Sequence, residues 1–176
     1  MKQDFSEKHG DLFRKHFEKN LDDESALLKA HLLIEEMLRD FCLEVVPNPL
    51  FLREARLTFK QTMLLTRSLL GPLVQGLPFD WVWNSLNQIN KLRNMLAHEL
   101  EPSHSKAEEI KETIIKINNE NRSKPLQEEP SFKGSLSFLC GALHAMLYIS
   151  AYAQQEKPEE SSHIEEPSLS RDTTKV

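Results

Sequence analysis

The stretch that decides the fold is DWVWNSLNQINKLRNMLAHEL, residues 80–100. Apolar side chains recur along it every three or four residues, at Val82, Leu86, Ile89, Leu96 and Leu100, with one gap at position 93. That spacing is typical of an amphipathic α-helix with one face turned toward a core. Pro78 and Pro102 bracket the stretch, and proline disrupts the interior of helices. We therefore expect one long helix over about residues 80–99, packed against other helices.

The sequence on either side of this helix predicts further helices and no strand. Helical periodicity recurs at about residues 4–19, 23–45, 52–70, 106–120 and 132–154. Asp23 is the expected N-cap of the second helix, which stops before Pro47. The third ends at Gly71, and Ser103 or Ser105 can cap the segment before the last helix. The prediction is an all-α fold, an up-and-down helical bundle of about five helices.

Length and charge set the domain organisation. The chain has 176 residues and a formal net charge of −5. This length suffices for one domain with a buried core, to which we assign residues 1–155. Residues 156–176 are polar and charged without a helical period, so we expect a disordered acidic tail. A net negative chain has no global basic field for coating a nucleic-acid duplex, although a small cleft can still engage a few phosphates.

Cysteines and apolar runs bear on cofactors and location. Cys42 and Cys140 each lie in an apolar stretch, which predicts buried, reduced thiols. Neither belongs to a pair at zinc-ligand spacing, so we expect no metal and no cofactor. No apolar run approaches the roughly 20 residues of a membrane span, and the N-terminus lacks the apolar core of a signal peptide. The predicted location is the cytoplasm, away from membranes.

An arginine interrupts the apolar line of the helix at position 93. A guanidinium that faces a core needs partners for its donors, because an unpaired buried charge is costly. Asn87, Asn90, Asn94 and His98 follow a neighbouring line, so four hydrogen-bonding side chains share one face. Two interpretations stay open. Either the asparagines face water while Arg93 reaches a surface carboxylate, or this face lines a polar cleft that holds a cation and an imidazole.

The spacing of Arg93 and His98 bears on the oligomeric state. Five positions separate them, so on an ideal helix their side chains point about 140° apart. One copy brings them together only through the long arginine side chain or through local distortion. Two copies facing each other across a two-fold axis combine them more readily. We therefore expect a homodimer.

Three segments together resemble HEPN domains. LNQINKLRNMLAHEL, residues 86–100, resembles the R-x4-6-H signature of that family, in the common bacterial form with Asn directly after the Arg. AHLLIEEMLRDF, residues 30–41, resembles its early core helix, in which a His or aromatic residue precedes a Glu by four positions, here His31 and Glu35. LTFKQTMLLTRSLLG, residues 57–71, resembles the next helix, where a Phe and a basic residue lead to a Leu-Gly ending.

This resemblance implies a helical bundle that dimerises and, in active members of the family, cuts RNA without a metal. It implies that His98 acts as general base or acid on the ribose 2′-hydroxyl, while Arg93 binds the scissile phosphate. Asn94 would hold the histidine or a phosphate oxygen, and Glu35 would orient Arg93 or His98 from the facing helix. RNA is the implied substrate. Many relatives are toxins or antiphage effectors, and several pair with a nucleotidyltransferase antitoxin. For this chain the resemblance leaves open such an antitoxin, a different antitoxin or regulatory partner protein, or none. In one subgroup the antitoxin modifies a Tyr two residues after the motif His. This chain has Leu100 at that position, so we do not expect control by that modification.

A second class of function stays open: a non-catalytic HEPN-like helical regulator, or a module that binds a protein or a nucleotide through the same face. Single residues have alternatives too. His31 and Glu35 could form a local pair one turn apart, with Glu35 also reaching Arg39. Lys60 could approach the cleft or be solvated. Trp81 and Trp83 are expected in the core, although one of them could stack on a base. His144 is expected in the core or in an interface. The other histidines are expected at the surface: His9, His16, His104 and His163.

Overall fold

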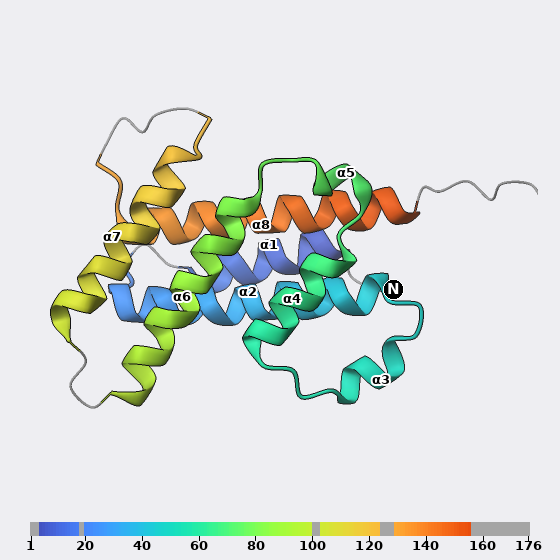
Figure 1. Cartoon of the computed structure of the whole chain (residues 1–176), viewed down its shortest axis with the longest axis horizontal. Coiled ribbons are helices and arrows are strands. Elements are labelled where there is room, and N and C mark those ends of the chain that lie inside the picture. Colours follow the sequence, from blue (N-terminus) through green and yellow to red (C-terminus); the bar gives the residue numbers. More distant parts are fainter. Residues whose placement is uncertain (1–3, 18–19, 100–102, 124–128, 156–176) are drawn as a thin grey trace, which may run out of the picture.

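The structure, a computed structural model, describes residues 4–17, 20–99, 103–123 and 129–155. Within these ranges it contains eight helices and no strand (Figure 1). They are α1 (Phe5–His16), α2 (Asp23–Val45), α3 (Pro49–Glu54), α4 (Phe59–Leu69), α5 (Pro72–Gln75), α6 (Asp80–His98), α7 (His104–Glu120) and α8 (Phe132–Gln155). The all-α prediction is confirmed, but the helices outnumber the five or so expected. The predicted tail, residues 156–176, lies outside the described residues.

One additional helix arises where a single helix was expected over residues 52–70, and α5 is another that was not predicted. In place of the single helix the chain forms α3 and α4. Asn48 begins α3 by accepting a first-turn backbone N–H, and Pro49 follows where its missing N–H has no cost. Thr58 begins α4 with a capping box: its hydroxyl accepts the N–H of Gln61, whose side chain accepts the N–H of Thr58. These N-terminal signals divide a segment whose apolar periodicity alone predicts continuity.

The start of α2 also differs by one residue from the prediction. Asp22, rather than Asp23, is the N-cap, and its carboxylate accepts the N–H of Ser25 at 2.8 Å and the Ser25 hydroxyl at 2.7 Å. Because these hydrogen bonds favour the ionised form, they lower the pKa of Asp22. The end of α2 agrees with the prediction, since the last helical residue is Val45, before Pro47.

The core forms around α2 and α8. In Figure 1, α1, α2 and α8 run side by side, while α4 and α6 cross α2 obliquely. α7 packs against α6 and α8. The largest fully buried side chains come from α2, α6, α7 and α8: Phe41, Leu27, Ile34, Met37, Leu38, Leu86, Ile89, Leu92, Ile114, Leu136, Leu139 and Leu143. Their removal from water is the main favourable contribution to folding.

α8 corrects the expectation that no segment matches a membrane span. By length and composition alone, Phe132–Tyr152 is apolar enough to cross a membrane, and 44% of its most apolar window is buried inside the molecule. The helix contacts α1, α2, α5, α6 and α7. A helix surrounded by partners needs apolar side chains on several faces, so a central core helix passes the same test.

The cysteines and tryptophans lie where they were predicted. Cys42 and Cys140 are free and buried. Burial raises the pKa of both thiols, that of Cys140 to about 12. Trp83 is buried, and Trp81 stacks on Phe138 with ring centroids 5.4 Å apart. Both indole rings therefore contribute to packing.

A network of Lys8, His9, Glu36 and Asp40, which we call the α1–α2 junction, fastens α1 to α2. The Asp40 carboxylate accepts hydrogen bonds from Lys8 Nζ at 2.5 Å and His9 Nε2 at 3.0 Å, and Lys8 also pairs with Glu36. The prediction of a surface His9 is wrong, because the ring of Phe5 covers it and leaves it 2% exposed. Burial by itself would raise the pKa of Asp40, but the bonds from His9 and Lys8 outweigh it and lower the pKa.

The remaining histidines follow the prediction where the structure describes them. His16 and His104 are exposed, and His163 lies outside the described residues. His144 is half-buried and stacks on Phe5, with ring centroids 5.7 Å apart. Burial lowers the pKa of His144, as expected for an imidazole packed into a core.

Candidate active site

A polar cleft of about 380 Å³ lies where α2, α4 and α6 meet. Eight residues line it: His31, Glu35, Thr58, Phe59, Lys60, Asn90, Arg93 and Asn94. Three of the four predicted site residues, Arg93, Asn94 and Glu35, are among them, and His98 is not. A second hollow of about 220 Å³ between α1, α2 and α8 has a mostly apolar lining, which also includes His9, Arg14 and His144. The predicted site residues are thus gathered in the polar cleft, apart from His98.

One wall of the polar cleft is α6, which contributes Asn90, Arg93 and Asn94. Arg93 is half-buried, and its Nη1 donates to Asn94 Oδ1 at 3.2 Å. A guanidinium has five N–H donors, and among the described residues this is its one hydrogen bond. The other donors can therefore serve an anion. Asn87, expected on the same face, instead donates to the carbonyl oxygen of Trp83 at 3.0 Å.

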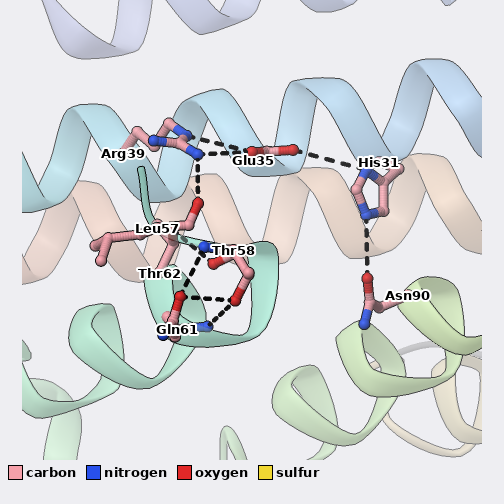
Figure 2. Close-up of polar contacts among 8 residues, drawn as sticks. All are labelled: His31, Glu35, Arg39, Leu57, Thr58, Gln61, Thr62 and Asn90. Carbon is pink, nitrogen blue, oxygen red and sulfur yellow. Dashed lines mark hydrogen bonds and ion pairs between the residues drawn. The ribbon is translucent and has the colours of Figure 1, made fainter. Parts of the chain in front are cut away.

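Glu35 forms part of the wall from α2. Its Oε1 accepts from Arg39 Nη2 at 2.9 Å, and Arg39 also donates to the carbonyl oxygen of Leu57 at 2.8 Å (Figure 2). The i, i+4 contact between Glu35 and Arg39, one of the alternatives that the sequence left open, is thus present. Through Leu57, Arg39 ties α2 to the segment that leads into α4.

His31 lines the polar cleft from α2 and contacts side chains of α4 and α6. Its ring stacks on Phe59 of α4, with centroids 4.4 Å apart and an interplanar angle of 26°. Its Nε2 lies 3.4 Å from Asn90 Oδ1 on α6, and its Nδ1 lies 4.0 Å from Glu35 Oε2 (Figure 2). Burial lowers the pKa of His31. The Asn90 bond and the Glu35 charge oppose that shift, and the Arg93 charge adds to it.

The third wall is the start of α4. Thr58, Phe59 and Lys60 line the cleft there, and the capping box fixes where the helix begins (Figure 2). The Lys60 side chain is exposed, so it meets solvent as well as the cleft. Lys60 and Arg93 place two cations around this small space against the single carboxylate of Glu35.

His98 lies apart from this cluster. It is the last residue of α6 and is exposed. This placement matches the helical geometry, because side chains five positions apart on one helix point in different directions. Asn90, Arg93 and Asn94 therefore line a polar cleft, as one of the two interpretations of this helix face expected. His98 faces solvent instead.

His31 lines the cleft, although it was not among the four predicted site residues. His31 sits on the mostly apolar side of α2 that faces α4 and α6, one turn before Glu35. An imidazole there, opposite the asparagine line of α6, was the available signal. The sequence alone did not place this imidazole in a cleft, because periodicity does not show which helix faces pack against each other.

The polar cleft has the components of acid–base chemistry on an anion. Arg93 and Lys60 supply positive charge, His31 an imidazole, and Asn90 and Asn94 amide groups. In the part of the chain that the structure describes, no group of three or more His, Cys, Asp or Glu side chains is placed to hold a metal ion. The arrangement suits a phosphate-bearing ligand better than an apolar one.

Known proteins do not assign this cleft a role. No protein-family model, no curated protein and no solved structure matches the chain.

Proposed function

We propose that the chain is a metal-independent endoribonuclease of HEPN type that acts as a toxin or defence effector. The observation that carries this proposal is the position of Arg93. A half-buried guanidinium, held by one bond to Asn94, lies in a polar cleft beside an imidazole and a carboxylate. Guanidinium groups bind phosphate through forked, charge-assisted hydrogen bonds, which suits a phosphodiester in the cleft.

The reaction needs no protein nucleophile, because RNA supplies its own. The ribose 2′-hydroxyl attacks the adjacent phosphorus, and the bond to the 5′-oxygen of the next nucleotide breaks. Arg93 would stabilise the charge that develops on the phosphate, with Asn94 beside it. Glu35 would orient the cationic and imidazole groups. His98, the motif histidine, would take or give a proton.

The exposure of His98 supports a homodimer in which each site uses groups from both copies. Its imidazole can reach a neighbouring molecule, whereas it does not line the cleft of its own chain. Leu28 and Leu32 on α2 are 47% and 65% exposed, which offers apolar surface on the helix that carries Glu35. A two-fold contact could cover them.

Mixing two inactive variants tests this sharing directly. If the site is shared, a dimer of one Arg93→Ala chain and one His98→Ala chain keeps one complete Arg–His pair, so mixing restores part of the cleavage. If both groups act within one chain, the mixture stays inactive. Sedimentation that shows an active monomer at micromolar concentration would also rule out the shared site.

The cellular setting is part of the proposal. We propose that the protein acts in the cytoplasm on RNA, without membrane association, and that an antitoxin or regulatory partner protein restrains it. Expression of the full chain should then arrest growth, and His98→Ala should relieve the arrest. A strain that grows normally while expressing folded wild-type protein would contradict the toxin role.

The alternative is a non-catalytic HEPN-like regulator, or a module that binds a protein or a nucleotide. The observation that favours it is again His98, which lies outside a cleft that is otherwise suited to hold a phosphate. In that case Arg93 would bind an anion, and no bond would be broken.

A cleavage assay in EDTA separates the two functions. We expect wild-type protein to cut RNA with the chelator present, leaving 2′,3′-cyclic phosphate ends. Arg93→Ala and His98→Ala should both lose the activity, and His16→Ala, at an exposed histidine on α1, should retain it. If folded Arg93→Ala and His98→Ala proteins cut as fast as wild type, the assignment fails.

A further inference from the structure

The atoms around the His31 ring determine which nitrogen carries the hydrogen. The carbonyl oxygen of Asn90 accepts, so Nε2 donates in that contact and Nδ1 keeps a lone pair. The Glu35 carboxylate lies 4.0 Å from Nδ1, too far for a direct hydrogen bond. A hydroxyl group of a ligand can touch both. His31 thus presents a proton acceptor on the Glu35 side of the polar cleft (Figure 2).

The surroundings of His31 keep its imidazole neutral and ready to accept a proton. Its pKa is lowered, mainly by burial and partly by the positive charge of Arg93, so the ring is unprotonated at neutral pH. Once a proton arrives, the negative charge of Glu35 stabilises the imidazolium. The stacking contact with Phe59 and the bond to Asn90 hold the ring orientation throughout, which avoids reorganisation during reaction.

We propose that His31 is the general base of the polar cleft, a role that rests on the ribonuclease function proposed above. Nδ1 of His31 takes the proton of the ribose 2′-hydroxyl while the 2′-oxygen forms its bond to phosphorus. The bond between phosphorus and the 5′-oxygen breaks, and that oxygen takes a proton from His98 in its acid role or from water. The products are a 2′,3′-cyclic phosphate and a 5′-hydroxyl, and the imidazolium returns its proton to solvent.

Position distinguishes His31 from His98 in this role. His31 is 6% exposed and lines the same cleft as Arg93, whereas His98 is exposed at the end of α6. A general base must lie within hydrogen-bond reach of the proton it removes from a substrate bound to Arg93. Within one chain, His31 is the imidazole that lines the cleft with Arg93.

The first test is the pH dependence of RNA cleavage by His31→Phe. Phenylalanine keeps a ring to stack on Phe59 but has no nitrogen, so kcat/KM should fall roughly 10²–10⁴-fold. The acidic limb of the wild-type pH profile, where His31 becomes protonated, should vanish from the residual activity. His31→Gln gives a second variant if the first does not fold, and His16→Phe is the matched control at an exposed histidine. Far-UV circular dichroism and thermal unfolding check that each variant is folded.

A second measurement uses wild-type protein and needs no turnover. Imidazole ¹⁵N resonances are followed while a 2′-deoxy dinucleotide, which lacks the attacking hydroxyl, is added. We expect the His31 signals to shift and the His16 signals to stay. Arg93→Ala should weaken binding by at least tenfold.

The outcomes separate the two proposals. If wild type cuts RNA and folded His31→Phe keeps its rate and pH profile, His31 is not the base, while the ribonuclease function stands. If wild type does not cut RNA, the ribonuclease function and the base role fail together. Shifts of the His31 signals would then assign the cleft to nucleotide binding alone, and their absence would remove this ligand from the cleft as well.

Discussion

Two polar clusters on α2 each contain a histidine and differ in how many hydrogen bonds their side chains make. In the α1–α2 junction, Asp40 is bonded by both Lys8 and His9, and these polar groups hold two helices together. In the polar cleft, Arg93 makes one hydrogen bond and His31 one long one, around an open space. Similar residue types thus hold two helices together in one place and line a polar cleft in the other. Polar groups that satisfy one another contribute to stability, whereas polar groups left open are available to a ligand.

Of the variants that contrast the two clusters, Arg93→Ala should show the largest effect, and it should be on activity. Removing the phosphate-binding cation is expected to lower RNA cleavage by roughly 10²–10³-fold. The free energy of unfolding should change by less than about 0.5 kcal/mol, since the guanidinium contributes one bond to an exposed neighbour. Initial cleavage rates and urea unfolding measure the two quantities.

The matched control for Arg93→Ala is Arg67→Ala, which removes the same charge from an exposed pair with Asp80. It should leave cleavage within about twofold, because surface ion pairs contribute little. An equal loss in both variants would mean that bulk charge, rather than the cleft, drives the reaction.

Asp40→Ala should show the opposite pattern. The substitution leaves Lys8 and buried His9 without their shared carboxylate, so we expect a loss of about 1–3 kcal/mol of stability in urea unfolding. RNA cleavage by the folded fraction should be unchanged. A stable variant with reduced cleavage would erase the distinction between the two clusters.

The pH dependence of stability should divide into two windows. Because the pKa of His31 is lowered in the folded state, the unfolded chain binds a proton first as the pH falls below 6.5, and stability declines there. The pKa of Asp40 is also lowered, so its contribution is present above 3.8 and is lost as the pH falls through the lower folded value.

Each proton taken up accounts for at most about 1.4 kcal/mol per pH unit. His144 also has a lowered pKa and acts in the first window. His31→Phe should therefore reduce the slope of stability against pH below 6.5 without removing it, and leave the acidic window intact. Urea unfolding at intervals between pH 3 and pH 7 measures both. An unchanged slope in that variant would show that His31 titrates alike in both states.

The smallest expected effect is on the stability of α4, which forms one wall of the cleft. Thr58→Ala removes the capping box of α4 and should cost about 1 kcal/mol in unfolding free energy, whereas Thr58→Ser should cost much less. Both variants should still bind the nucleotide used for wild type. Loss of binding in Thr58→Ala alone would mean that the cap shapes the cleft directly.

Helices with strong punctuation were predicted well from the sequence. α2 ends before Pro47, and α6 and α8 match their expected ranges within a residue or so. The break between α3 and α4 was missed, since apolar periodicity continues across it and only the Thr58–Gln61 box marks the new start. Local capping competes with periodicity, and its outcome depends on where the chain must turn.

The site was predictable only in part for a geometric reason. Residues on one helix face could be grouped from spacing, which placed Arg93 and Asn94 together, and the resemblance to HEPN domains added Glu35. Which side chains of α2 and α4 stand opposite them depends on how helices cross. The place of His31 in the cleft therefore depends on the three-dimensional packing of the helices, and the burial of His9 likewise depends on the docking of α1.

The two buried thiols make thiol labelling a measure of how often the helices open. Thiol reagents attack the thiolate, and the raised pKa values of Cys42 and Cys140 keep that form scarce while the helices stay packed. Labelling at neutral pH then proceeds only when a helix separates from its neighbours. Cys42 contacts Thr66 of α4, and Cys140 lies on α8. The labelling rate of Cys42 would report how often α4 separates from α2. The labelling rate of Cys140 would report, independently, how often α8 separates from its neighbours.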